Sequence, residues 1–168
     1  MGSLHFKQHQ KEHLNGQYTI IASYTDKGNN NIAPLTGHEL VNLRNARVST
    51  AFADVYKGFP RWRNSLGEGD HKSFVLLKDI DLSGIKKFTY EYASLNKDGV
   101  IEVRINSQEG PVISSVAYSA TGSWDKRETV TGVLKTAVEG RNDLYFMVLK
   151  KEKPNDKIIN LSHITFEK

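Results

Sequence analysis

Hydrophobic and polar residues alternate along much of the chain with the two-residue period of β-strands. In one run Ile101, Val103 and Ile105 stand on one side, and the residues between them are charged. The run Phe88–Ala93 repeats the pattern with aromatic residues. Because successive side chains of a strand point to opposite faces, each run predicts a strand with one buried face.

Short runs of this kind recur from residue 41 onward, and turn residues such as glycine, asparagine and proline separate them. The predicted strands are Val41–Val48, Phe74–Lys78, Phe88–Ala93, Val100–Ile105, Val112–Tyr118, Thr129–Val138, Leu144–Leu149 and Ile158–Phe166. Leu144–Leu149 is apolar throughout, which predicts a central strand covered on both faces. No amphipathic helix lies between the runs, so the pattern predicts an all-β fold, an antiparallel β-sandwich.

The N-terminal part reads differently, and we expect residues 1–37 to be a lead-in segment before one sandwich domain at residues 38–168. Tyr18–Tyr24 alternates like a strand and is followed by a turn-rich stretch. This strand is either the tail of a preceding region or an addition to the main domain.

Three histidines in the lead-in, His5, His9 and His13, have a spacing that would align them on one face of a helix. No carboxylate motif of a helical metal site accompanies them. A frayed polar segment is therefore favoured over a metal site.

The composition of the chain argues against several classes of function. A chain of 168 residues with 38% hydrophobic residues can build a core without disulfides, and the absence of cysteine excludes thiolate chemistry. The net charge of +4 is scattered, whereas a nucleic-acid interface needs clustered basic residues, so no nucleic-acid partner is predicted. No apolar run approaches the length of a membrane span, and no signal peptide is visible.

Catalytic patterns are weak. Asp79 and Asp81 would share a strand face and offer a carboxylate pair, but paired surface acids are usually solvated. His38, His71 and His163 are isolated in sequence, and each is expected at a loop or a sheet edge. The sequence therefore predicts no catalytic residues.

Several motifs occur together in the second half of the chain. They are GVIEVRINSQEGPVISSV (residues 99–116), TGSWDKRETVTGVL (121–134), GRNDLYFMV (140–148) and INLSHITFEK (159–168), with GDHKSFVLLKDIDLSGIKKFTY (69–90) upstream. In order and spacing this set resembles carbohydrate-binding module family 6. The resemblance implies a jelly-roll β-sandwich of the galactose-binding type. It also implies a non-catalytic domain that holds an attached enzyme on a polysaccharide.

The resemblance also implies sugar-binding residues. Trp124 matches the loop tryptophan of the family, Trp62 lies where a second cleft aromatic is expected, and Asn160 matches the cleft asparagine. Tyr56 is the alternative to Trp62. A flat aromatic ring suits the C–H face of a pyranose, and an amide side chain can hydrogen-bond its hydroxyls.

Each of these residues also has a structural interpretation. Trp124 belongs either to the core or to a sugar cleft. For Trp62, which two arginines flank, surface presentation is favoured. Asn160 is either a sugar ligand or a turn cap that bonds its own backbone.

Four departures from the family pattern stand out. Arg127 and His163 occupy positions of aromatic residues, Ser162 replaces an acid, and the segment 50–54 has no clear match to the calcium-binding glutamate. A hard cation needs several oxygen ligands, and two expected carboxylates are missing. The resemblance thus leaves a structural calcium doubtful and a reduced sugar cleft possible.

The wider context also follows from resemblance. The segment Ala22–Gly37 looks like part of the C-terminal region of large exported proteins of Bacteroidetes-type bacteria. It implies a secreted, periplasmic or cell-surface protein with an upstream catalytic domain, a glycoside hydrolase or sugar dehydrogenase. The alternative function is a structural or protein-interaction sandwich that binds no sugar.

Overall fold

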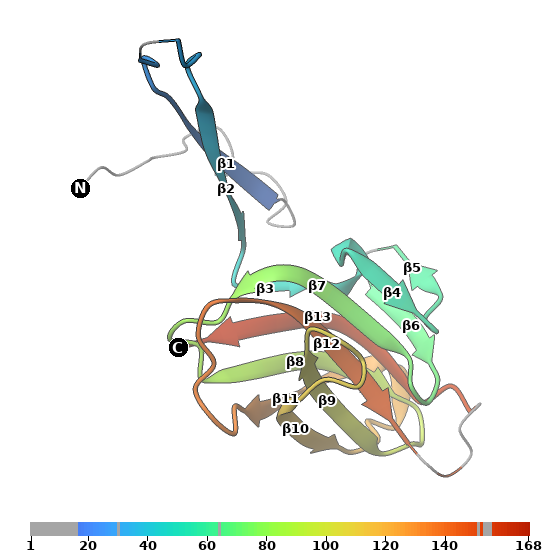
Figure 1. Cartoon of the computed structure of the whole chain (residues 1–168). Coiled ribbons are helices and arrows are strands. Elements are labelled where there is room, and N and C mark those ends of the chain that lie inside the picture. The colour runs from blue at the N-terminus through green and yellow to red at the C-terminus, as the bar shows by residue number, and fades with distance from the viewer. Residues whose placement is uncertain (1–16, 30, 64, 151, 153–155) are drawn as a thin grey trace. The chain divides into compact units, whose positions relative to one another are not determined.

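The computed structural model describes residues 17–29, 31–63, 65–150, 152 and 156–168. The strands in Figure 1 are β1 (Gln17–Thr25), β2 (Thr36–Arg44), β3 (Arg47–Ser49), β4 (Val55–Lys57), β5 (Arg61–Trp62), β6 (Ser65–Gly69), β7 (Phe74–Asp81), β8 (Lys87–Ser94), β9 (Gly99–Ile105), β10 (Val112–Tyr118), β11 (Ser123–Val133), β12 (Arg141–Leu149) and β13 (Ile159–Glu167). One 3₁₀ turn, η1, spans Thr50–Phe52. The predicted histidine group at residues 5, 9 and 13 lies outside the described residues.

The chain divides into two compact units, Met1–Asn45 and Ala46–Lys168. The domain boundary expected between residues 37 and 38 therefore falls inside β2. The reason is pairing: β2 is antiparallel to β1 over its whole length, from Gln17 opposite Arg44 to Thr25 opposite Thr36. The connection between them is closed by Asp26, whose carboxylate accepts hydrogen bonds from two backbone N–H groups.

The second unit is a two-layer sandwich. One layer has five strands in the order β10-β9-β12-β7-β4, and the other has the order β11-β8-β13-β6-β5, with β3 also paired to β13. All these pairs are antiparallel. The predicted all-β antiparallel sandwich is confirmed.

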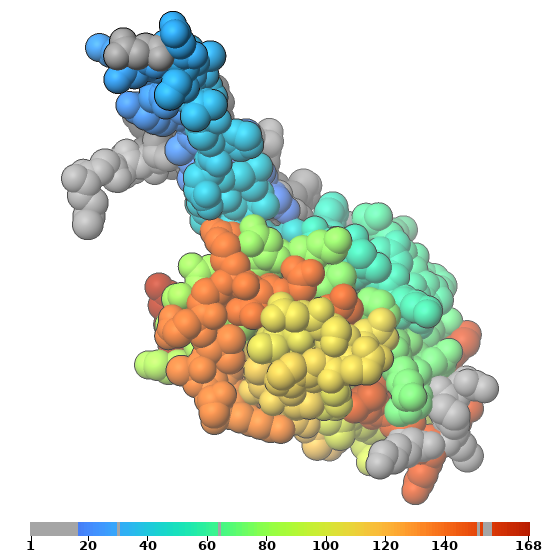
Figure 2. Space-filling model, in the orientation of Figure 1, coloured from blue at the N-terminus to red at the C-terminus, as the bar shows by residue number. Residues whose placement is uncertain are grey.

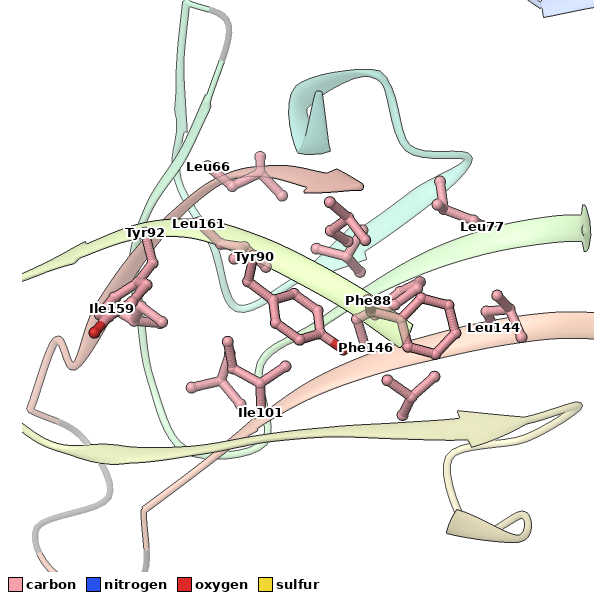
Figure 3. Packing of buried hydrophobic residues seen from close by; sticks show 14 of the residues in the cluster. Leu66, Leu77, Phe88, Tyr90, Tyr92, Ile101, Leu144, Phe146, Ile159 and Leu161 are labelled. Carbon is pink, nitrogen blue, oxygen red and sulfur yellow. The ribbon is translucent and has the colours of Figure 1, made fainter. Parts of the chain in front are cut away.

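The core lies between the two layers. Figure 3 shows Phe88, Tyr90 and Leu161 of one layer pointing toward Ile101 and Phe146 of the other. Phe88, Tyr90 and Ile101 are among the residues that the alternation placed on the buried faces. The aromatic rings meet edge to face, for example Phe88 and Phe146 with ring centroids 5.6 Å apart.

Strand β12 is central in its layer, between β9 and β7, as its unbroken apolar sequence predicted. Its residue Phe146 enters the main core, while Met147 packs on the opposite face with Phe74 and Leu76. Both faces of the strand are therefore covered.

At one side of the sandwich, backbone hydrogen bonds join the edge of one layer to the edge of the other. Figure 2 shows β10 and the turn before it (yellow) beside the connection after β11 (orange). The backbone N–H of Lys135 donates to the carbonyl of Ile113 at 2.8 Å, and Ser114 pairs with Leu134. These bonds protect strand edges that would otherwise be open for pairing.

Two parts of the strand prediction were wrong. Residues 47–69 hold four short strands where only the end of one was predicted, because strands of two to five residues are too short to show a period. Strand β11 begins at Ser123, six residues earlier than expected, because its first half is polar and exposed. None of the helices in the described part of the chain has the length and apolar character needed to cross a membrane.

A protein that consists of residues 46–168 alone should fold cooperatively. Its core draws only on residues of the second unit, whereas an isolated two-stranded hairpin is at best marginally stable in water. We expect thermal unfolding, followed by circular dichroism, to show one transition within a few degrees of that of the full chain. A broad or absent transition would contradict this division of the chain.

Candidate functional site

The indole of Trp62 and the side-chain amide of Asn160 both lie against Gly67, which has no side chain. All three residues belong to the six-stranded layer, the one that contains β11, β8, β13, β6, β5 and β3. A Cβ atom built on Gly67 (β6) would lie 2.6 Å from Cδ1 of Trp62 (β5) and 3.2 Å from Oδ1 of Asn160 (β13). Both side chains therefore lie against the same point of the β6 backbone and are direct neighbours. The neighbouring strands β5 and β6 and the distant strand β13 supply this group.

The local backbone explains why these residues meet. Strand β5 pairs with β6 in a tight hairpin, with Trp62 opposite Ser65. The register of β6 against β13 then shifts, and Glu68 takes a left-handed conformation with φ of 52°. Its N–H donates a hydrogen bond of 2.6 Å to Oδ1 of Asn160. Such a conformation is costly for a residue other than glycine, and this bond helps to hold it.

The turn-cap interpretation supposed that the Asn160 side chain bonds its own backbone, but its Oδ1 accepts from Glu68. Its oxygen accepts from another strand, and the amide nitrogen of the same side chain is a donor. The residue is half-buried. This arrangement orients the amide next to the indole.

The two tryptophans differ in exposure. The side chain of Trp62 is exposed, with 59% of its surface accessible, which fits the surface presentation expected for it. Trp124 is half-buried and is the second residue of β11 rather than part of a loop. The adjoining Ser123 pairs with Ser94 on β8, whose neighbour Ala93 pairs with Asn160. Trp124 thus lies on the strand beyond β8 as seen from Asn160, at a point where the pairing of β11 with β8 is interrupted.

Tyr56 is not brought to this group. It lies on β4, at the edge of the five-stranded layer, opposite Val75. Its half-buried ring packs against the main core. The structure therefore brings Trp62 and Asn160 together and places Tyr56 in the other layer.

Sequence reasoning missed Gly67 and Glu68, although both carried a signal. The two glycines of Gly67-Glu68-Gly69 stand out in the sequence, but the reason that position 67 has no side chain appears only once Trp62 lies against it. Glycine inside a strand often marks such a close approach.

Replacing Gly67 with alanine should disturb the site and leave the fold in place. The new methyl group would overlap Cδ1 of Trp62, and the indole is free to move because it is exposed. We expect altered tryptophan fluorescence and at least several-fold weaker ligand binding, with an unfolding midpoint close to that of the parent. Unchanged fluorescence and binding would show that the indole does not rest on Gly67.

The residues implied for a structural calcium do not fit that ion. Ser162 provides a hydroxyl group where a carboxylate is expected. In the segment 50–54, the Thr50 hydroxyl donates to the carbonyls of Leu161, at 2.5 Å, and Ser162. A carbonyl engaged in this way is a poorer cation ligand, and calcium takes six to eight oxygen ligands. Within the described ranges, no three histidine or acidic side chains are grouped to hold a metal ion.

The carboxylate pair considered for catalysis is engaged in structure. Asp79 forms an ion pair of 2.9 Å with Arg141. Asp81 accepts the backbone N–H of Ser83, and this bond holds the pKa of the Asp81 carboxyl below its usual range. A general acid needs a raised pKa, so the shift at Asp81 is in the opposite direction.

A charged group, which we call the Glu91 cluster, lies on the outer face of the six-stranded layer. It consists of Arg47, Glu91, Arg127 and His163, from strands β3, β8, β11 and β13. The Glu91 carboxylate contacts Arg47 at 2.7 Å, Arg127 at 3.0 Å and Nδ1 of His163 at 3.3 Å. The expectation that His163 lies at a loop or an edge was wrong, because β13 is a central strand.

The cluster shifts two pKa values. Burial raises the pKa of Glu91, but the surrounding Arg127, His163 and Arg47 outweigh it and hold that pKa below its usual value. Burial lowers the pKa of His163, and so does the charge of Arg47, while Glu91 offsets them only in part. His163 is therefore neutral at pH 7.

This predicts a loss of stability in mild acid. The unfolded chain binds a proton at His163 from about pH 6.5 downward, whereas the folded chain resists it, so protonation favours unfolding. Urea unfolding at a series of pH values should show the free energy of unfolding falling as the pH drops below 6.5. A His163→Gln variant should show a smaller fall, and an identical profile would contradict the assignment.

The similarity of this chain to known proteins identifies its family. The sequence profile of the family described as "Carbohydrate binding module (family 6)" matches residues 44–168. A search of curated proteins finds no match.

Solved structures share the fold. A family 6 carbohydrate-binding module from Clostridium cellulolyticum, in complex with xylose, has a TM-score of 0.66 and 21% identity, and the match covers 73% of this chain and 96% of that one. A β-1,3-glucan binding module of the family from Bacillus halodurans has a TM-score of 0.65 and 21% identity over 73% and 95%. A glycoside hydrolase family 43 arabinoxylan arabinofuranohydrolase from Bacillus subtilis, in complex with cellotetraose, has a TM-score of 0.62 and 15% identity, over 84% of this chain and 32% of the enzyme. The profile match spans most of the chain and all of the sandwich, and the chain therefore belongs to carbohydrate-binding module family 6.

Proposed function

We propose that this module binds a poly- or oligosaccharide by stacking a pyranose ring on the indole of Trp62, next to the amide of Asn160. The observation that carries the proposal is the exposed indole held over Gly67 beside that amide. Family membership supports carbohydrate as the ligand class.

The physical basis is burial of two apolar surfaces. A tryptophan can bury roughly 150–250 Å² in a contact, and each Å² of apolar surface removed from water contributes about 25 cal/mol. One indole face therefore suffices for weak, reversible binding. Trp124, two strands away from Asn160, would contact a neighbouring part of the ligand.

Polar groups at the rim would set the orientation of the sugar. The nitrogen of the Asn160 amide can donate to a hydroxyl oxygen. Glu68, whose N–H bonds to Asn160, forms an ion pair of 2.7 Å with Lys157 through its carboxylate. Both carboxylate and ammonium groups can bond hydroxyls, and ordered water can bridge the remainder.

The module would act without turnover and keep an attached enzyme on its substrate, in an extracellular or cell-surface setting. In support, the Bacillus subtilis arabinofuranohydrolase carries the matching fold within a longer enzyme. The attached enzyme would be a glycoside hydrolase or a sugar dehydrogenase.

A screen of the protein against soluble and insoluble polysaccharides tests the proposal. It should be run with added calcium and with a chelator, and we expect binding to at least one polysaccharide to be equal under both conditions. A protein that binds no glycan would instead be a structural or interaction module. Binding that depends on calcium would contradict our account of Thr50 and Ser162.

A further inference from the structure

The Glu91 cluster lies on the same sheet face as the proposed sugar site. Asn160 pairs with Ala93 and His163 pairs with Glu91, so the two sites are two residues apart along β8. Residues two apart on a strand share a face and lie about 7 Å from each other. A glycan chain held at Trp62 can therefore reach the cluster with a neighbouring ring or substituent.

The cluster has an excess of positive charge. Two guanidinium groups surround one carboxylate, and His163 is neutral at pH 7. The side chains of Arg47 and Arg127 are half exposed, at 52% and 51%, while that of Glu91 is 24% exposed. Solvent therefore meets the cationic groups of the cluster more than the anionic one.

Glu91 positions the guanidinium groups. In the part of the chain that the structure describes, Arg127 donates to Glu91 through one terminal nitrogen. A guanidinium has five N–H donors in a rigid fork, which suits a carboxylate or sulfate. Ion pairs this exposed add little to stability, so fold stability alone gives a weak reason for the cluster.

The residue types at two positions of the cluster also favour a charged ligand. The family resemblance leads us to expect aromatic side chains at positions 127 and 163, where they would favour the C–H face of a sugar. A guanidinium and an imidazole stand there instead, and β13 and β11 bring them to the same carboxylate. Both departures make this surface more polar, and Arg127 adds a positive charge to it.

We propose that Arg127 and Arg47, held by Glu91, bind the anionic substituent of an acidic glycan whose neighbouring ring stacks on Trp62. The substituent is a carboxylate of a uronic acid or a sulfate ester, which share the chemistry that a guanidinium recognises. This inference rests on the function proposed above, because the ring at Trp62 fixes the position of the anionic group.

The test uses matched pairs of polymers that differ in charge alone. Polygalacturonate is compared with its fully methyl-esterified form, and a sulfated galactan with the same galactan after desulfation. Isothermal titration calorimetry is performed on the full chain, on Arg127→Gln, and on Arg141→Gln as the matched control. Arg141 also pairs with a carboxylate, that of Asp79, but it lies in the other layer.

We expect the parent protein to bind one anionic polymer about tenfold more tightly than its neutral counterpart, with the preference weakened by salt. Arg127→Gln should lose this preference, and Arg141→Gln should retain it. Preference for polygalacturonate identifies the carboxylate, and preference for the sulfated galactan identifies the sulfate.

Other outcomes overturn the inference in different ways. If neutral polysaccharides bind as tightly as the charged ones, or if Arg127→Gln keeps the preference, the anionic subsite is wrong while the proposed function stands. If none of these polymers binds but the polysaccharide screen finds a ligand, the anionic subsite is wrong and the proposed function stands. If the screen also finds no ligand, both proposals fail.

Discussion

Replacing Phe146 with alanine is expected to lower the free energy of unfolding by about 3–5 kcal/mol. Phe146 has none of its surface exposed and lies on the central strand β12. Its ring contacts Phe88, Tyr90 and Phe166 edge to face, with centroid distances of 5.6, 6.2 and 6.2 Å. Removal of the ring leaves a cavity between two layers whose strands cannot close together.

Urea unfolding of the two proteins measures this effect. Domains of this size have a total stability of about 5–15 kcal/mol, so the variant should lose a large part of it and unfold at a clearly lower urea concentration. Phe52→Ala is the matched control, because that phenylalanine is 40% exposed and should cost less than about 1 kcal/mol. If Phe52→Ala lowers the free energy of unfolding as much as Phe146→Ala does, Phe146 is not a central residue of the core.

Replacing Trp62 with alanine is expected to weaken glycan binding by roughly 30-fold or more, because central aromatic residues contribute about 2 kcal/mol or more in such contacts. The unfolding free energy should stay within about 0.5 kcal/mol of the parent, since the indole is largely exposed. Titration calorimetry with the polysaccharide found in the screen measures the first quantity, and urea unfolding measures the second.

Trp62→Phe separates the ring from other effects of the substitution. Phenylalanine keeps a flat aromatic face over Gly67, so a large part of the affinity should remain. If the alanine variant binds as well as the parent, the ligand does not use Trp62. If it unfolds readily, the side chain is structural.

The layers of this fold could be predicted because hydrophobic and polar residues alternate along their longer strands. Phe88, Tyr90 and Tyr92 are buried on the face that their alternation indicated, and the unbroken apolar run at β12 lies at the centre of its layer. Burial of one face imposes this period directly on the sequence. The short strands β3 to β6 were missed because their side chains are positioned by neighbouring strands and not by local pattern.

The candidate site was only partly predictable, for a related reason. An exposed tryptophan and a terminal asparagine were identified from motifs, but their contact over Gly67 depends on a hairpin and a register shift. The sequence marked Arg127 and His163 of the Glu91 cluster as departures from the family pattern, but it did not show that they meet at one carboxylate. Its members come from four strands, and only the order of strands in the sheet brings them together.

The most direct test of the account is the indole N–H signal of Trp62 during a glycan titration. The chain has two tryptophans, so a ¹H–¹⁵N correlation spectrum contains two indole signals, which Trp62→Phe and Trp124→Phe assign. We predict that the Trp62 signal shifts progressively with the bound glycan and saturates at the concentration given by calorimetry. Saturated glycan binding that leaves the Trp62 signal in place would contradict the central claim.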